Sequence, residues 1–249
     1  MKQKAQTEVG LIATDGNNRS TTRTHAAKEK VQISNIKHII AIASGKGGVG
    51  KSTISTNLAV SLAGRGFKVG LLDADVYGPS QPKLLGIKDK PQSPDGQIIL
   101  PPRNHGVSMM SLGLMMPEDE AIVWRGPMLI GALQQMLTHV QWGQLDILLV
   151  DLPPGTGDVP LTLSQKVEIT GSIIVSTPQD IALIDAKKGI NMFRRMNVPI
   201  LGLIENMASF TCDNCHKQHH PFGAGGAKRE ADRQKIPFLG EIPLDLSIR

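Results

Sequence analysis

The chain has 249 residues, of which 40% are hydrophobic, 20% charged and only 3% aromatic. This length and composition predict one α/β domain with a sizeable core, and the scarcity of aromatics argues against gripping single-stranded nucleic acid by base stacking. The formal net charge is +5, but residues 1–30 hold six basic and three acidic side chains, which leaves +2 for the remainder. We therefore expect no basic groove and no nucleic-acid partner.

The beginning of the chain differs in composition from the rest. Residues 1–34 are polar and show no sustained periodicity, so they predict a flexible arm in front of a folded domain over residues 35–249. No apolar run approaches the roughly 20 residues of a membrane span, and no secretory signal is evident. With two cysteines, these features predict a reducing, cytoplasmic setting and no membrane partner.

A glycine-rich segment follows the first predicted strand, residues 38–43. Gly45, Gly50, Lys51 and Ser52 satisfy the P-loop spacing G-x-x-x-x-G-K-S/T, and a helix is predicted directly afterwards. Backbone N–H groups of such a loop meet phosphate oxygens beside a helix N-terminus, while Lys51 would reach the β- and γ-phosphates and the Ser52 hydroxyl would ligate Mg²⁺. The predicted ATP-binding loop comprises Gly45, Lys46, Gly47, Gly48, Val49, Gly50, Lys51, Ser52 and Thr53.

Two other interpretations of this loop remain open. The glycines also fit the dinucleotide-binding fingerprint, with Asp73 or Asp75 near the distance expected for a ribose-binding acid. The second alternative is a glycine-rich turn that binds no ligand. The Lys-Ser pair after the last glycine favours a triphosphate site, because a dinucleotide site does not need it.

From residue 36 onward, strand-like and helix-like segments alternate, which predicts a mostly parallel sheet with helices on both faces. Further strands are predicted at residues 68–72, 107–114, 145–150, 171–177, 199–204 and 237–240, and helices at 127–140 and 180–196. Residues 79–102 predict loops and short turns, because proline and glycine interrupt them repeatedly. A helix is expected after the last strand, where the chain ends, so we expect a truncated C-terminus.

Acidic residues follow two of these strands at their carboxyl ends, where ligands collect in open parallel sheets. Asp73 and Asp75 follow one strand and Asp151 follows another. We favour Asp151 as a Mg²⁺-organising carboxylate and Asp73 as part of the nucleotide site, although strand-end aspartates also serve as helix caps. The Gly155 backbone N–H could reach the γ-phosphate.

Residues 45–53 resemble the deviant Walker A loop of the ParA/MinD class, with Lys46 as the additional lysine. Residues 73–80, 124–128, 151–158 and 205–207, in the same order and followed by a Cys-x-x-Cys motif, resemble the Mrp (ApbC-like) iron–sulfur cluster carriers. The similarity runs from about residue 35 to the end. It departs from the family pattern between the cysteines, where Pro is common and this chain has Asp-Asn.

The resemblance implies an ATP-hydrolysing homodimer. It implies that Lys46 reaches the phosphates of the neighbouring subunit and that Asp75 lies in switch I near the attacking water. It places Asp151 in switch II and Asn206 close to the adenine. Lys46, Lys51, Asp75 and Asp151 are then the expected catalytic residues, because cations on the phosphates stabilise the charge that develops in phosphoryl transfer.

The two cysteines, Cys212 and Cys215, admit four interpretations. A c-type haem site is disfavoured because haem attachment requires export and no export signal is evident. A thioredoxin-like redox pair is disfavoured because such a pair lies at a helix start in another fold. Zinc could be completed within one chain by nearby histidines, namely His216, His219 and His220. The favoured interpretation is a [4Fe–4S] cluster shared by two chains, since such a cluster takes four thiolates and each chain supplies two.

These expectations combine into one functional hypothesis. The chain is predicted to be an ATP-dependent carrier that holds an iron–sulfur cluster between two subunits and delivers it to recipient apoproteins. The alternatives are a partitioning or positioning ATPase of the ParA/MinD type, a zinc-stabilised P-loop ATPase without cluster transfer, and a metabolic kinase.

Overall fold

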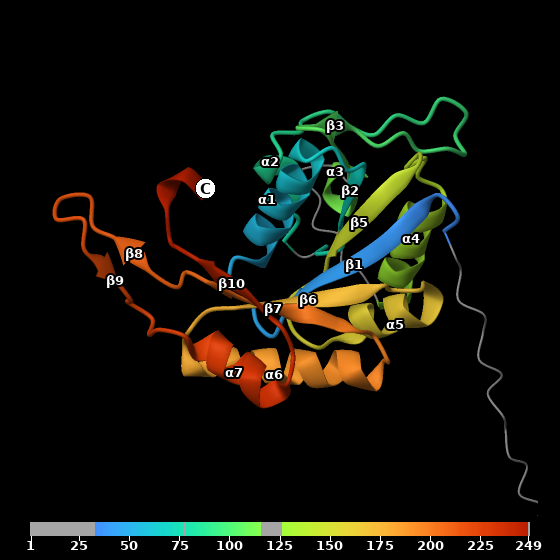
Figure 1. Cartoon of the computed structure of the whole chain (residues 1–249). Coiled ribbons are helices and arrows are strands. Elements are labelled where there is room, and N and C mark those ends of the chain that lie inside the picture. Colours follow the sequence, from blue (N-terminus) through green and yellow to red (C-terminus); the bar gives the residue numbers. More distant parts are fainter. Residues whose placement is uncertain (1–32, 77, 116–125, 249) are drawn as a thin grey trace, which may run out of the picture.

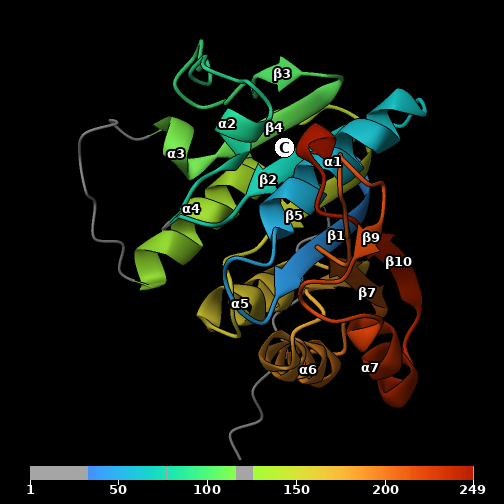
Figure 2. The ribbon, with the colours of Figure 1, turned by 90° about the vertical axis from the view of Figure 1, so that its left-hand side faces the viewer.

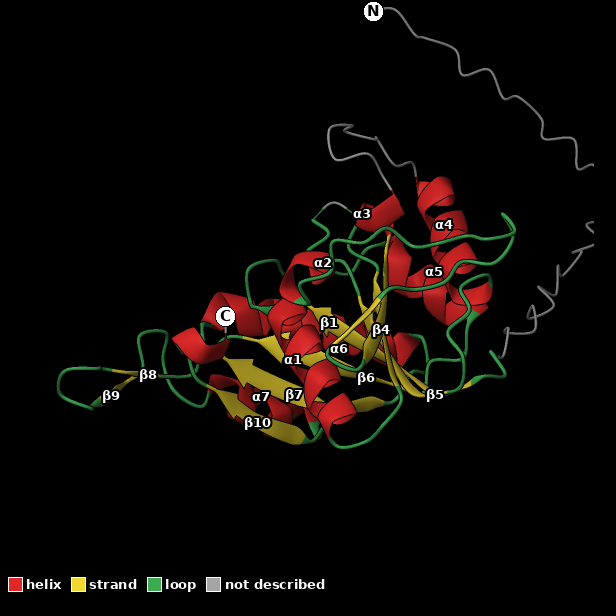
Figure 3. Ribbon diagram, turned by 90° about the horizontal axis from the view of Figure 1, so that it is seen from above, coloured by secondary structure: helices red, strands yellow, loops and turns green. Residues whose placement is uncertain are grey.

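The structure, a computed structural model, describes residues 33–76, 78–115 and 126–248. An eight-stranded sheet crosses the molecule in the order β10-β7-β6-β1-β5-β2-β4-β3, and a separate two-stranded hairpin, β8–β9, projects beyond it (Figures 1 and 3). Every neighbouring pair in the large sheet is parallel except β3–β4. The predicted α/β class with a mostly parallel sheet is therefore confirmed.

The strands of the sheet are β1 (Ile36–Ser44), β2 (Val69–Asp73), β3 (Arg103–Asn104), β4 (Val107–Ser111), β5 (Leu145–Asp151), β6 (Gly171–Ser176), β7 (Ile200–Asn206) and β10 (Phe238–Ile242), and the hairpin is β8 (Phe210–Thr211) with β9 (Gln218–His219). The helices are α1 (Lys51–Gly64), α2 (Gln81–Leu84), α3 (Leu112–Met115), α4 (Gly126–Thr138), α5 (Asp158–Lys166), α6 (Asp180–Arg195) and α7 (Gly226–Gln234), with a 3₁₀ turn at Leu246–Ile248.

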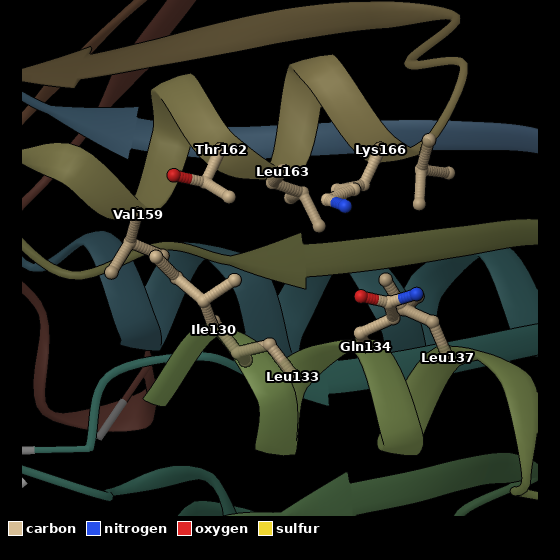
Figure 4. A pocket seen from close by; sticks show the side chains of 9 residues that line it. Ile130, Leu133, Gln134, Leu137, Val159, Thr162, Leu163 and Lys166 are labelled. Atoms are coloured by element: carbon tan, nitrogen blue, oxygen red, sulfur yellow. The ribbon is translucent and has the colours of Figure 1, made fainter. Parts of the chain in front are cut away.

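Helices cover both faces of the sheet, and each face has its own apolar core. Side chains of α4, α5, α6 and α7 pack on one face, whereas α1 and the segment after α2 pack on the other (Figure 2). The central strands are apolar on both sides because both faces are covered; Leu148, Leu149 and Val150 of β5 are fully buried. Two adjacent helices also pack together, with Ile130 and Leu133 of α4 facing Leu163 of α5 (Figure 4).

The sequence predicted the long elements well and the short ones poorly. The predicted strand over residues 107–114 ends at Ser111, where α3 begins. Within residues 79–102, predicted as loops, the chain forms the short helix α2. Helix α5 was not predicted, although Pro160 in its first turn and the buried residues Val159 and Leu163 indicate a helix in retrospect.

Some expectations fall on residues outside the described part of the chain. They are the flexible arm, of which residues 1–32 are not described, and the 124–128 motif, of which only residues 126–128 are described. Among the described helices, none combines the length and apolarity needed to cross a membrane.

The side chain of Phe193 on α6 provides a test of the larger core. It is fully buried, so Phe193→Ala should lower the free energy of unfolding by about 3–5 kcal/mol through lost burial and a residual cavity. Phe67→Ala is the matched control, because Phe67 is 46% exposed and its truncation should cost far less. Urea-induced unfolding measures both, and equal losses would contradict the assigned packing.

Candidate functional site

The P-loop connects the carboxyl end of β1 to the first turn of α1, and two of its glycines are required by close approaches. Gly45 lies against α6, where an added Cβ would be 2.1 Å from the backbone carbon of Asp185. Gly50 has a φ of +81°, and an added Cβ would be 2.2 Å from Asn206 Nδ2. The loop is thus wedged between α6 and the end of β7, which accounts for two glycines of the motif.

The loop surrounds a hollow of about 200 Å³. Its lining brings together most of the predicted phosphate-binding and catalytic residues, namely Lys46, Gly47, Gly48, Val49, Gly50, Lys51, Ser52, Thr53 and Asp75. Ser44 and Pro154, which were not predicted, also line it. The free N–H groups of the first turn of α1 and the positive end of its dipole lie at this hollow. The arrangement is suited to an anion such as a phosphate chain.

At the base of the site, Lys51 forms a buried ion pair with Asp151. Lys51 Nζ lies 2.6 Å from Asp151 Oδ1, and the two side chains are only 6% and 0% exposed. Asp151 Oδ1 also accepts a hydrogen bond from the Ser55 hydroxyl at 2.9 Å, and Oδ2 accepts one from Gln81 Nε2 at 2.7 Å. The predicted phosphate-binding lysine and the predicted Mg²⁺-organising carboxylate therefore contact each other in this structure.

Asp73 lies beside Asp151, because the two residues are in register at the ends of the parallel strands β2 and β5. Burial, together with the negative charge of Asp151, raises the pKa of Asp73 to about 7. Asp73 accepts hydrogen bonds from the Ser111 hydroxyl at 3.1 Å and from the backbone N–H groups of Asp75 at 3.1 Å and Gln81 at 3.3 Å. Since Gln81 is the first residue of α2, Asp73 also holds the start of this short helix, whose N-cap residue is Ser80.

Two residues predicted to contact nucleotide form hydrogen bonds with the P-loop and the strand before it in this structure. The Gly155 N–H, a candidate for the γ-phosphate, donates to the Ser44 carbonyl at 2.9 Å. Asn206, expected near the adenine, donates from Nδ2 to the Val49 carbonyl at 2.8 Å. Both residues lie at the site, and their roles toward nucleotide stay predictions.

Two buried polar residues of this region, Gln81 and Glu205, have contacts that the sequence did not predict, although Glu205 belongs to the 205–207 motif. Gln81, which is fully buried, lies in a segment whose prolines and glycines predicted only loops. Glu205 is also fully buried and accepts the Gly225 and Ala227 N–H groups at 3.1 and 2.5 Å, which fixes the start of α7. A Glu at the end of an apolar strand was the available signal for Glu205, and Gln81 had none.

The cysteines lie on the β8–β9 hairpin. The Cys212 N–H donates to the Lys217 carbonyl at 3.0 Å, and the His216 N–H donates to the Cys212 carbonyl at 2.8 Å, which closes the turn. Both thiols are free. Backbone N–H groups of Cys215 and Asn214 point at the Cys212 sulfur and lower its pKa, with a further contribution from the Cys215 side chain, against the opposing charge of Asp213. A thiolate is the form that ligates metals.

The nearby histidines do not complete a metal site with these thiols. The His220 ring is directed elsewhere, with Nδ1 2.8 Å from the Ala208 carbonyl oxygen. Across the described residues, no three His, Cys, Asp or Glu side chains come together as metal ligands. One chain thus offers a pair of thiols, which is half of the four-thiolate set of a [4Fe–4S] cluster.

The raised pKa of Asp73 makes the stability of the nucleotide-free protein depend on pH. Below about pH 4 the Asp73 carboxyl is protonated in both the folded and the unfolded protein, so the free energy of unfolding does not change with pH on its account. Between about pH 4 and 7 the carboxyl ionises only on unfolding, so the free energy of unfolding falls as pH rises. Relative to Asp73→Asn, the free energy of unfolding of the wild type should fall by roughly 2–3 kcal/mol between pH 5 and 8. Urea unfolding across this range measures the difference.

The exposed Asp89→Asn change is the matched control for this titration, because Asp89 lies at the surface. It shows the effect of removing one surface carboxylate. A difference between the wild type and Asp73→Asn that stays constant over this pH range would contradict the assigned burial of Asp73 beside Asp151.

Comparison with known proteins gives consistent results. The ParA family model described as NUBPL iron-transfer P-loop NTPase matches residues 35–249. The iron-sulfur cluster carrier protein of Haemophilus influenzae is 50% identical over 224 residues, covering 90% of this chain and 60% of that protein. The Arabidopsis thaliana iron-sulfur protein required for NADH dehydrogenase, mitochondrial, is 52% identical over 221 residues, covering 88% of this chain and 71% of that protein. This chain thus spans about 60% of the length of the bacterial relative.

Solved structures agree with the sequence relatives. A nucleotide-binding protein from Archaeoglobus fulgidus in complex with ADP has a TM-score of 0.76 and 42% identity, covering 86% of this chain and 85% of that one. The cell division ATPase MinD of Pyrococcus furiosus, at 22% identity and a TM-score of 0.58, shares the fold. The resemblance to ParA/MinD-class ATPases and iron–sulfur cluster carriers is confirmed, and the chain belongs to the NUBPL-type iron-transfer P-loop NTPases of the ParA family.

Proposed function

We propose that this chain binds and hydrolyses ATP and carries a [4Fe–4S] cluster between two copies of itself, from which the cluster passes to recipient apoproteins. The observation that carries the proposal is the pair of free thiols on one hairpin, six residues beyond Asn206, which contacts the P-loop. A residue that contacts the P-loop and half of a thiolate cage therefore lie on β7 and its continuation. Family membership supports both parts.

In the nucleotide site, ATP binding requires Lys51 to exchange partners. Its ammonium now neutralises Asp151, and the same group is the one that would meet the β- and γ-phosphates. Ser52 and Asp151 would hold Mg²⁺, which when bound neutralises charge on the phosphates. Asp75, on the lining of the hollow, would orient the attacking water.

Lys46 completes this arrangement from a second copy of the chain. Lys46 lines the hollow, and its side chain would reach the phosphates bound by the neighbouring subunit. A cation supplied in this way stabilises charge only when the two copies are together. Hydrolysis would thus be coupled to dimerisation, and loss of the γ-phosphate would release the loops that it orders.

The cluster is cargo in this proposal. Two chains related by a two-fold axis bring four thiols together, and the lowered pKa of Cys212 favours its thiolate form. A site shared between two chains can release its cargo when the chains separate. Because both cysteines are free thiols, we place this activity in a reducing, cytoplasmic setting.

The carrier is favoured over the alternatives by specific observations. Similarity to MinD is at the level of fold alone, whereas the family match and the relatives of about 50% identity concern iron–sulfur proteins. The zinc alternative needs ligands from one chain, and the described residues do not gather them.

The two lysines of the P-loop should separate binding from hydrolysis. Lys51→Ala should abolish ATP binding, because it removes the phosphate ligand and leaves Asp151 unpaired. Lys46→Ala should retain binding and lower the rate of hydrolysis at least about tenfold. Titration with a fluorescent ATP analogue and phosphate-release assays measure the two effects.

The control for the lysine variants is Lys37→Ala, since Lys37 is exposed and pairs with Asp146 at the other end of β1 and β5. It should bind and hydrolyse ATP as the wild type does. Normal turnover in both P-loop variants would remove the phosphate assignment.

Anaerobic reconstitution with iron and sulfide tests the cluster proposal. We expect a dimer with about four irons per two chains and the absorption spectrum of a [4Fe–4S] cluster. Cys212→Ala and Cys215→Ala should lose the cluster, whereas His219→Ala should keep it. Stoichiometric zinc in a single chain, with no uptake of iron, would instead support the zinc alternative.

A further inference from the structure

Gln81 connects three parts of the candidate nucleotide site through one buried side chain. Its Nε2 donates to Asp151 Oδ2 at 2.7 Å and to the Ser52 carbonyl at 3.2 Å, while its Oε1 accepts from the Thr56 hydroxyl at 2.5 Å. The side chain is fully buried. Since the Asp151 carboxylate only accepts hydrogen bonds when ionised, the contacts allow the carboxamide one orientation.

The backbone of Gln81 fixes a second feature, the segment that carries Asp75. The N–H groups of Asp75 and Gln81 donate to the two oxygens of Asp73, at 3.1 and 3.3 Å. The chain between them is therefore held at both ends by one carboxylate at the end of β2. Through its side chain, Gln81 joins this same segment to α1 and to the end of β5.

The two oxygens of the Asp151 carboxylate have different partners. Asp151 Oδ1 contacts Lys51 and Ser55, whereas Oδ2 is held by Gln81 within the described part of the chain. When Lys51 turns to the phosphates, Oδ1 loses its cation. The hydrogen bond from Gln81 to Oδ2 does not depend on Lys51 and can keep the carboxylate in place.

We propose that Gln81 is a positioning residue for ATP hydrolysis: its carboxamide holds the Asp151 carboxylate, and ties it to the Asp75 segment, while Lys51 changes partners. This inference rests on the proposed ATP hydrolysis. The Gln81 side chain does not line the phosphate hollow, so its loss should leave most of the binding contacts intact. Misplacement of a catalytic carboxylate by about 1 Å can lower a rate on the order of 10²-fold.

The test is Gln81→Met, which keeps a side chain of similar length and removes its hydrogen bonds. We expect kcat to fall roughly 10- to 100-fold, with ATP affinity within about threefold of the wild type. Phosphate release gives kcat and KM, and titration with a fluorescent ATP analogue gives Kd. Gln135→Met, at an exposed position on α4, is the matched control and should match the wild type in all three quantities.

Thr56→Val provides a second route, because it removes the donor to Gln81 Oε1 and leaves Gln81 in place. It should lower kcat in the same direction, and the double variant should be no slower than Gln81→Met, since both changes act on one contact. A merely structural role would instead weaken ATP binding and lower Tm without a selective loss of kcat.

Each failure is distinguishable. An unchanged kcat in Gln81→Met, or a loss confined to ATP affinity, would overturn the positioning role. If Gln81→Met does not fold, an unchanged kcat in Thr56→Val overturns it. A wild-type protein that binds ATP without hydrolysing it would contradict the proposed function itself, before any variant is compared.

Discussion

The buried contact between Lys51 and Asp151 is the interaction on which the rest of the site depends. It joins the first turn of α1 to the end of β5, with the ammonium and carboxylate 2.6 Å apart and almost without solvent. A carboxylate in such a place is costly unless it is paired, and Asp73 beside it adds a second acid whose pKa is raised to about 7. In the proposed function, the Lys51 ammonium that neutralises these acids is also the group that binds the phosphates. Nucleotide binding would therefore be accompanied by a rearrangement of the acids.

The carboxyl end of β7 connects the nucleotide site to the cysteine hairpin. Asn206 closes the strand and contacts the Val49 carbonyl of the P-loop. A few residues later, Ala208 and Ser209 are fixed to the end of β10 and the residues that follow it: the Ala208 N–H donates to the Ile242 carbonyl, and the Leu244 N–H donates to the Ser209 carbonyl. The β8–β9 hairpin begins immediately afterwards and projects beyond the sheet (Figures 1 and 3). The hairpin that carries the two cysteines thus begins a few residues after Asn206, which contacts the P-loop.

Much of this arrangement could be predicted from local sequence patterns. The P-loop spacing and the apolar strands located the site, and the proximity of Asp73 to Asp151 follows from parallel strands that end at one edge. The contact between Lys51 and Asp151 could not be predicted, because it depends on how α1 packs against β5. The role of Gln81 could not be predicted for a related reason. Its burial results from the position of α2 against α1, whereas the prolines and glycines of residues 79–102 predict only turns.

The cysteine hairpin shows the same limit of sequence spacing. Histidines within a few residues of Cys215 predicted a possible zinc site, because spacing alone does not show where side chains point. In the structure, β8 pairs with β9 in an antiparallel hairpin, and the His220 ring contacts the Ala208 carbonyl oxygen. What spacing did convey is the number of thiols per chain, and that number is what requires a second copy for a four-thiolate cluster.

The most direct test of a cluster shared between two chains is native mass spectrometry of anaerobically prepared, nucleotide-bound protein. We expect a mass equal to two chains plus one four-iron, four-sulfide cluster, and its replacement by cluster-free species when Cys212 is changed to Ala. A protein that stays single-chain with nucleotide, or a dimer without sulfide-bound iron, would contradict it.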